Sequence, residues 1–231
     1  MQNPRLSIIM PAHNEESVIA GVIEKFCPAL SQAEIIVVCN GCTDNTFAVS
    51  SKLKEKYKNL VVLDFGRIFK GGAILEGFKV ARGDIVGFVD SDGAFEPSDV
   101  IKIVGGIREA GGAIASKWTG KGFDSPFSQE RKFSARVWNF FVRLFLGLKH
   151  PDTQAGCKFF KKEAVEAIDK NFSARGFAFD IELLYKIEKA GFRVNEVFCV
   201  PKETKAGIFS LKSTPKMFLD LLKVWYNSKF H

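Results

Sequence analysis

The chain has 231 residues, of which 46% are hydrophobic, and carries a formal net charge of +7. This apolar share is ordinary for a globular protein with a substantial core, and no low-complexity tract or internal repeat occurs. The charge suits a phosphate-bearing ligand, an anionic membrane surface or nucleic acid without choosing among them. A nucleic-acid function would depend on this charge alone, so we predict no nucleic-acid partner.

Neither a secretory leader nor a membrane-spanning helix is expected. The residues before Leu6 are too few for the apolar core of a signal peptide, and no window of about 18 uninterrupted apolar residues occurs. The five cysteines are an odd number, which favours reduced thiols inside a cell. Cys39 and Cys42 form a C-x-x-C pattern typical of redox chemistry or half a zinc site, but no second pair or nearby histidine completes a zinc set.

The first half of the chain alternates between apolar runs of strand length and stretches with helical periodicity. Strands are predicted at Leu6–Met10, Glu34–Val38, Leu60–Leu63 and Ile85–Val89. Helices are predicted from Asn14 as N-cap, over Thr46–Tyr57, after a Lys70–Ala73 loop to Ala81, and from a Ser98 or Asp99 cap to about Ala110. This rhythm predicts a mostly parallel α/β sheet with helices on both faces and right-handed crossovers.

The second half is less regular. Its predicted elements are strand Ala113–Ser116, a polar and mobile stretch Lys117–Glu130, helix Phe133–Leu148, strand Cys157–Phe160, helix Phe179–Ala190, strand Val194–Val200 and helix Pro215–Phe230. No clear linker separates the two halves. We therefore expect a single domain over 1–231, with a nucleotide-binding half at 1–112, an acceptor-side half at 113–210 and an amphipathic C-terminal helix at 211–231.

Loops after the four predicted strands share one edge of the sheet if those strands are parallel. These loops are Pro11–Glu15, Asn40–Asp44, Lys70–Ala73 and Asp90–Asp92, and together they predict a nucleotide crevice. Gly71 and Gly72 would permit close backbone approach, and a helix amino end there would attract phosphate. Neither the Gly-x-Gly-x-x-Gly pattern nor the Walker sequence occurs, which disfavours classical dinucleotide and P-loop binding.

The strand at Ile85–Val89 ends in two carboxylates, Asp90 and Asp92. Hard oxygen ligands at the carboxyl end of a strand suit Mg²⁺ or Mn²⁺, and such ions usually accompany a substrate diphosphate. An Asp-rich turn without metal explains the same residues, because Asp-Ser-Asp-Gly is also good turn chemistry.

Several segments together resemble family 2 glycosyltransferases of the GT-A fold, and in particular dolichyl-phosphate mannose and glucose synthases. The segments are Ser7–Glu15, Val37–Asp44, Gly83–Asp84, Val89–Asp92, Asp152–Phe160, Phe177–Leu184 and Glu196–Pro201. The resemblance extends over roughly residues 5–205. It implies a Rossmann-like sheet that binds a nucleotide-diphosphate sugar, either GDP-mannose or UDP-glucose, with Mn²⁺ or Mg²⁺ as cofactor.

The resemblance also implies roles for individual residues. Asp92 and Asp90 would hold the metal, and Asp90, Asp92, Asp152 and Arg131 would serve catalysis. Donor-binding residues would be Pro11, Ala12, Asn14, Glu15, Asn40, Lys70, Gly71, Asp90, Ser91, Lys117 and Gln154. Lys117 and Arg131 would lie against phosphates, whereas Asp152 and Gln154 would lie near the sugar.

Three positions depart from the family pattern. Asn40 replaces a carboxylate that commonly pairs with the base, and an amide tolerates more than one base. Ala94 replaces a glutamine on the metal side, and Lys117 replaces an arginine, which loses a bidentate phosphate contact.

A phosphate acceptor needs no conspicuous base. A phosphate monoester is largely ionised at neutral pH, so the protein's task is positioning and the neutralisation of the leaving diphosphate. Lys117, Lys121, Arg131, Lys132 and Arg136 are placed to gather phosphates, although such clusters are often solvated surface. Asp152 is the candidate base if the acceptor is a hydroxyl.

Two helices have an apolar face with basic flanks. For Phe133–Leu148 core packing is the preferred explanation, whereas for Pro215–Phe230 membrane contact is preferred because terminal helices have less to pack against. We therefore expect a peripheral protein on the cytoplasmic face of a membrane, with a polyprenyl phosphate and the membrane surface as partners and room for a separate membrane-anchoring subunit.

The leading hypothesis is an inverting, metal-dependent transfer of a hexose, with mannose favoured over glucose, to a polyprenyl or dolichyl phosphate. One alternative is the same fold acting on a glycan or glycolipid hydroxyl. Another is a nucleotide-sugar-binding protein without catalysis, suggested by Asn40 and Ala94.

Overall fold

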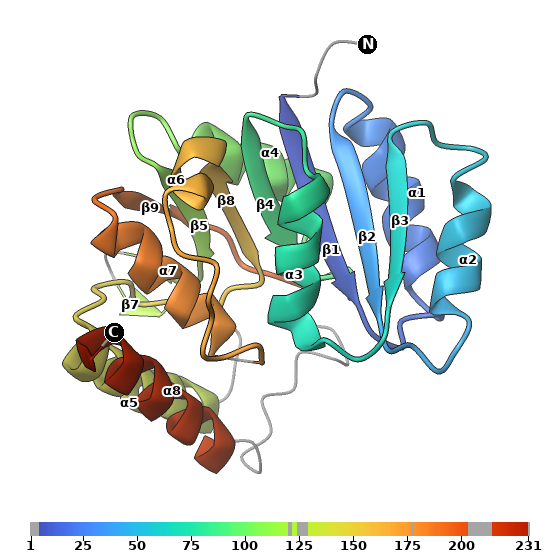
Figure 1. Cartoon of the computed structure of the whole chain (residues 1–231). Helices are drawn as coiled ribbons and strands as arrows, with labels where there is room; N and C mark the ends of the chain where they lie inside the picture. Colours follow the sequence, from blue (N-terminus) through green and yellow to red (C-terminus); the bar gives the residue numbers. More distant parts are fainter. Residues whose placement is uncertain (1–4, 120–121, 124–128, 177, 203–213, 231) are drawn as a thin grey trace.

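The structure is a computed structural model that describes residues 5–119, 122–123, 129–176, 178–202 and 214–230. Within them seven strands form one twisted sheet with helices on both faces (Figure 1). The strands of this sheet are β1 (Leu6–Ala12), β2 (Glu34–Asn40), β3 (Leu60–Phe65), β4 (Ile85–Val89), β5 (Gly112–Ser116), β8 (Cys157–Lys161) and β9 (Val194–Phe198). A separate two-stranded ribbon joins β6 (Trp118–Thr119) to β7 (Gly122–Phe123), in the stretch predicted to be mobile.

The sheet order is β3-β2-β1-β4-β8-β5-β9. β1, β2, β3 and β4 are mutually parallel, and β9 is parallel to β5. β8 lies between β4 and β5 and runs antiparallel to both. The carboxyl ends of the parallel strands and the amino end of β8 therefore meet at one edge, which we call the C-edge. The mostly parallel sheet predicted from the sequence is confirmed.

The helices are α1 (Ile19–Ala29), α2 (Thr46–Leu53), α3 (Phe69–Val80), α4 (Pro97–Gly105), α5 (Gln129–Leu146), α6 (Lys162–Glu166), α7 (Phe179–Lys189) and α8 (Thr214–Phe230). One core lies between the sheet and α1 and α4, with apolar residues such as Ile23, Phe26 and Ile103. The other lies between the sheet and α3, α6 and α7, and extends to α5 and α8. Because helices cover both faces, β2 is buried along its whole length, and its residues 35–39 are all apolar.

Two predicted helix starts are wrong. Asn14 does not cap α1, which begins at Ile19; it has a φ of 58° and its side chain accepts a 2.8 Å hydrogen bond from the Thr43 backbone instead. α4 begins at Pro97, and its capping box is formed by Glu96 and Asp99 rather than by a Ser98 cap.

The predicted Lys70–Ala73 loop is also wrong, because these residues form the first turn of α3. A β-carbon on Gly71 would come within 2.5 Å of the Phe179 ring. Gly71 is therefore explained by the close packing of α3 on α7 and not by approach to a phosphate.

α5 and α8 pack against each other beside the sheet, at the lower left of Figure 1. Phe145 contacts Phe218 and Trp225 at ring-centroid distances of 6.2 and 5.7 Å. Each helix also keeps an exposed apolar residue, since Phe140 is 62% and Leu219 58% exposed. In the described part of the chain, no helix has the length and apolar content needed to cross a membrane.

His150 ties the segment before β8 to two other elements. Its Nδ1 lies 2.9 Å from Glu196 on β9 and its Nε2 lies 2.8 Å from Glu188 on α7. Burial by itself would lower the pKa of His150, but hydrogen bonds to both carboxylates outweigh it and raise the pKa to about 9. The protonated ring is therefore the form that the fold stabilises.

We expect the contribution of His150 to stability to fall as the pH rises. A folded-state pKa above the unfolded value of 6.5 gives stabilisation that is complete below that value and is lost by about pH 9. His150→Gln should cost at most about 3 kcal/mol at pH 6 and much less at pH 9.5. Urea unfolding of both proteins across this range measures the gap, with Lys149→Gln as the exposed control. A gap that stays constant with pH would contradict the assignment.

Candidate active site

The loops after β1 and β2 are joined by hydrogen bonds at the C-edge. The buried amide of Asn40 donates to the Ala12 carbonyl at 2.9 Å, and the Glu15 backbone donates to the Thr46 hydroxyl at 2.7 Å. Asn40 and Ala12 are almost fully buried, whereas Asn14 is exposed and Glu15 half-buried. Both loops also carry exposed side chains, such as Asn14 in the first loop and Thr43 in the second.

The loop after β4 is fixed on both sides. The hydroxyl of Ser91 is buried and donates to the Pro11 carbonyl at 2.8 Å, and the Asp90 backbone N–H donates to the Gly156 carbonyl at 2.8 Å. Asp92 accepts a 3.0 Å hydrogen bond from the Ala94 backbone. Ser91 and Pro11 thus connect the loops, and the carboxylates on either side of Ser91 are held at defined positions.

Lys70 contacts two carboxylates from different parts of the chain. Its Nζ lies 2.9 Å from Asp90 Oδ1 and 3.4 Å from Asp180 Oδ2. The other oxygen of Asp180 lies 2.7 Å from Nζ of Lys158, which is fully buried on β8. Burial lowers the pKa of Lys70, but the charges of Asp180 and Asp90 outweigh it and the pKa is raised, so this lysine is protonated.

Asp152 and Gln154 come from the loop before β8, which the antiparallel strand brings to the same edge. Asp152 is buried, and its Oδ2 lies 3.6 Å from Nζ and 3.4 Å from the backbone nitrogen of Lys117, directly after β5. Burial raises the pKa of the Asp152 carboxyl and the charge of Lys117 opposes it. Gln154 is half-buried. Arg131 belongs to α5, but its side chain lies outside the described residues.

The C-edge is rich in negative charge. Burial raises the pKa of Glu15, and the nearby charges of Asp92, Asp44 and Asp90 raise it further. Such repulsion among carboxylates marks a place where a cation would be stabilised. Over the described residues, no group of three or more His, Cys, Asp or Glu side chains forms a ready metal cluster. Two hard carboxylates are nevertheless sufficient for Mg²⁺ or Mn²⁺ when a substrate phosphate supplies further oxygens.

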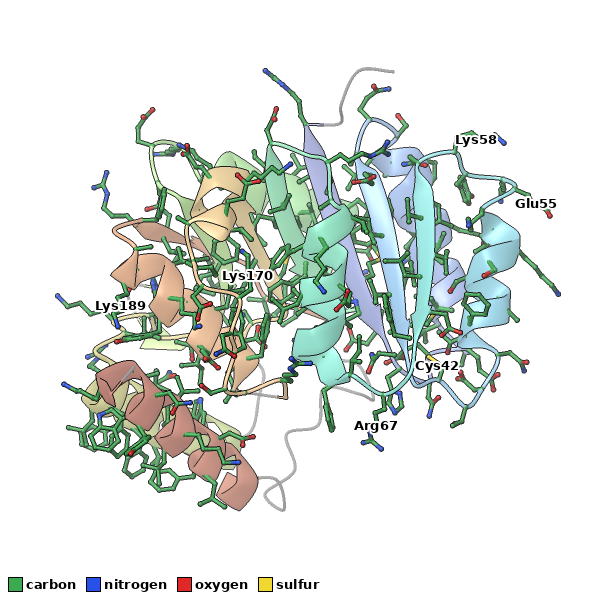
Figure 2. All side chains as sticks on the ribbon, in the orientation of Figure 1. Cys42, Glu55, Lys58, Arg67, Lys170 and Lys189 are labelled. Atoms are coloured by element: carbon green, nitrogen blue, oxygen red, sulfur yellow. The ribbon has the colours of Figure 1, made fainter. Side chains whose placement is uncertain are left out.

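The C-x-x-C cysteines are free thiols. Cys39 is fully buried, and burial raises its pKa to about 12, with the neighbouring Cys42 adding to the shift. Cys42 lies at the C-edge near Arg67 (Figure 2). The Cys39 thiol, whose pKa is raised by burial, is a poor nucleophile and metal ligand.

Residues 7–169 match the family model described as glycosyl transferase family 2. The chain belongs to this family. It is a glycosyltransferase, and the sheet and its flanking helices have the GT-A fold predicted from the sequence.

Individual relatives are similar over almost the whole chain. Glycosyltransferase AglD of Haloferax volcanii is 31% identical over 96% of the chain, which spans 37% of that protein's length. The dolichyl-phosphate beta-glucosyltransferase of Drosophila melanogaster is 28% identical over 95% of the chain and 74% of its own length. The polyprenol monophosphomannose synthase of Mycolicibacterium smegmatis is 27% identical over 91% of the chain and 82% of its own length. The predicted resemblance to dolichyl-phosphate synthases is confirmed.

A solved structure shows the same fold. Glucosyl-3-phosphoglycerate synthase from Mycobacterium tuberculosis, in complex with Mn²⁺, UDP and phosphoglyceric acid, superposes with a TM-score of 0.72. The two proteins are 22% identical, and the match covers 95% of this chain and 78% of the other. At this identity the similarity concerns the fold.

The structure adds three residues that sequence reasoning gave no role: Gly156, Lys158 and Asp180. All three lie in segments that carry the family resemblance, but spacing alone did not show that they meet Asp90 and Lys70. A charged Lys158 inside an apolar strand was the available signal, because a lysine is almost never fully buried unless it is paired.

We expect Gly156→Ala to reduce glycosyltransferase activity without unfolding the protein. A β-carbon at this position would come within 1.7 Å of Asp90 Oδ2, so the carboxylate must move. A displacement of about 1 Å at a reacting centre costs about 100-fold in rate. Steady-state kinetics with a thermal melt would measure this. Gly21→Ala on α1 is the control, because its β-carbon would meet nothing within 4 Å; equal activity of the two variants would refute the role of Gly156.

Proposed function

We propose that this protein transfers a hexose, mannose in preference to glucose, from a nucleotide-diphosphate sugar to a polyprenyl or dolichyl phosphate, with inversion. The observation that carries the proposal is the similarity to enzymes named for this type of acceptor, over 91% and 95% of the chain. These matches also cover 74% and 82% of the relatives' own lengths, so they are not confined to a shared nucleotide-binding half. The fold supports a donor site at the C-edge.

The chemistry of a phosphate acceptor suits the charges at this edge. The acceptor is ionised before it binds, so the protein must orient it and neutralise phosphates rather than remove a proton. Three buried or half-buried carboxylates, Asp90, Asp152 and Asp180, are each paired with a lysine. Lys117 beside Asp152 is a cation for these phosphates, and Arg131 is proposed to join it.

Asp92 and Asp90 are the residues that would hold Mn²⁺ or Mg²⁺. Their carboxylate oxygens and the surrounding negative charge on Glu15 fit a hard divalent cation. When bound, the ion would neutralise charge on the leaving diphosphate. Asp90 would keep Lys70 beside the donor, and the exposed first loop, with Asn14 and Glu15, would face the nucleoside.

The pair α5 and α8 is proposed as the membrane-facing part. Exposed Phe140 and Leu144 on α5 and Leu219 on α8 are accompanied by the exposed cations Arg143 and Lys223. An apolar surface with basic flanks suits binding to anionic lipid headgroups. The membrane face proposed for this contact is the cytoplasmic one. A separate membrane-anchoring subunit would be compatible with this arrangement, and no step of the proposal involves nucleic acid.

Transfer to a glycan or glycolipid hydroxyl is the second candidate function. It is favoured by Asp152, because the raised pKa of this buried carboxyl suits a proton acceptor. The same residue thus serves either as a partner of Lys117 or as a base, depending on the acceptor.

An acceptor panel tests the function. Purified protein is incubated with Mn²⁺ and either UDP-glucose or GDP-mannose, and with dolichyl phosphate, dolichol without phosphate, or a hexoside carrying free hydroxyls. The proposal expects glycolipid product with dolichyl phosphate alone. Product only with hydroxyl acceptors would move the assignment to the second candidate, and donor binding without any transfer would favour a non-catalytic role.

Asp92→Ala should abolish transfer and weaken Mn²⁺-dependent donor binding. The reason is loss of a carboxylate ligand for a divalent ion on the diphosphate, which we expect to cost at least about 1,000-fold in kcat/KM. Calorimetry with and without Mn²⁺ separates this effect from a folding defect. The control is Asp169→Ala, whose side chain is 73% exposed. Full activity of the Asp92 variant would rule out the metal assignment.

A further inference from the structure

A chain of four alternating charges runs from the C-edge into the core. Asp90 contacts Lys70 at 2.9 Å, Lys70 contacts Asp180 at 3.4 Å, and Asp180 contacts Lys158 at 2.7 Å. The outer members are half-exposed, with side-chain exposures of 35% for Asp90 and 27% for Lys70. The inner pair is buried, at 4% and 0%. Lys158 and Asp180 therefore cannot contact a donor in this conformation.

Stability alone does not explain the buried ion pair of Lys158 and Asp180. Removing two charges from water carries a large penalty, and replacing a buried ion pair with apolar residues is often neutral or stabilising. Lys158 is further accommodated by the Ala155 carbonyl and by the Phe88 ring, whose centroid lies 5.4 Å from Nζ. These contacts fix the Lys158 ammonium. The Asp180 carboxylate then bridges two lysines, with Oδ1 near Lys158 and Oδ2 near Lys70.

The contact between α3 and α7 sets the position of the chain. The Phe179 ring occupies the space that a side chain on Gly71 would need, and the Gly71 N–H donates to the Arg175 carbonyl at 2.8 Å. Lys70 and Asp180 are the neighbours of Gly71 and Phe179 in sequence. The close packing of the two helices therefore brings this lysine and this aspartate together.

We propose that the buried Lys158–Asp180 pair is a positioning device that holds the Lys70 ammonium beside Asp90 on the donor side of the active site. A lysine side chain has several rotatable bonds, so one contact at a half-exposed carboxylate leaves it mobile. Asp180 supplies the second contact at 3.4 Å, and the 2.7 Å ion pair with Lys158 holds the Asp180 carboxylate in place. The kinetic consequence rests on the proposed function, because it assumes that Lys70 acts on a bound sugar nucleotide.

The first test reads the position of Lys70 without any substrate. Lysine acetylation by an N-hydroxysuccinimide ester is followed by peptide mass spectrometry, with the 67% exposed Lys79 as internal reference. In the double variant Lys158→Met/Asp180→Leu, Lys70 should react about fivefold faster relative to Lys79, because it has lost an ion-pair partner. The control is Glu34→Gln, which removes a buried charge next to Arg82 at the opposite edge of the sheet.

The double variant replaces both charges with apolar groups and so avoids leaving one buried charge unpaired. Circular dichroism and thermal melting establish that it is folded. A folded double variant in which Lys70 reacts no faster than in the Glu34 variant would overturn the proposal.

The second test is a double-mutant cycle on transfer. Lys158→Met/Asp180→Leu should lower kcat/KM about 100-fold, and Lys70→Met should do so to a similar extent. Combining them should add no more than about threefold, because the inner pair acts through Lys70. Additive losses would overturn the proposal. If the wild-type protein transfers no sugar to any acceptor, the proposed function has failed, and the acetylation result alone decides the positioning role.

Discussion

The Asp90 backbone N–H donates a 2.8 Å hydrogen bond to the Gly156 carbonyl at the point where β8 runs antiparallel beside β4. The reversal of β8 brings the loop that carries Asp152 to the same edge as the loops of the parallel strands. It also pairs Lys158 with Phe88, two residues before Asp90. A sheet whose strands were all parallel would leave these residues at the opposite edge, so Asp152 would not reach the edge that carries Asp90.

The surroundings of the carboxylates at this edge differ between the surface and the interior. The carboxylates nearest the surface, Glu15, Asp90 and Asp92, lie close enough to repel one another, and Asp90 is also paired with Lys70. Deeper in the protein, each carboxylate has a lysine partner, as in Asp152 with Lys117 and Asp180 with Lys158. A site arranged in this way would suit a metal ion and a diphosphate at the surface without leaving buried charges unpaired.

Periodicity and turn residues were sufficient to predict the four strands of the first half and their parallel arrangement, because β1 to β4 alternate with helices in a regular rhythm. The end of the Ile85–Val89 run indicated Asp90 and Asp92, and the family resemblance added Asp152; the structure brings all three to one edge. The local errors concern residues whose partners lie far away in the sequence. Asn14 is not a helix cap, because its side chain accepts a hydrogen bond from the Thr43 backbone. Gly71 does not belong to a phosphate-binding loop, because it packs closely against the Phe179 ring. Contacts of this kind join residues distant in sequence, so local pattern cannot predict them.

The loop after β2 shows how the structure changes the interpretation of a departure from the family pattern. Asn40 replaces a carboxylate associated with the base, which suggested a more permissive base contact. In the structure this amide is buried, and its NH₂ group donates a hydrogen bond to the Ala12 carbonyl that joins the two loops. That donor is therefore not free to contact a base. Base selection in this protein would then depend on backbone groups and on the exposed side chains of the first loop. Asn40 would thus affect how rigidly the first loop is held, and it would affect nucleotide preference indirectly, through that loop.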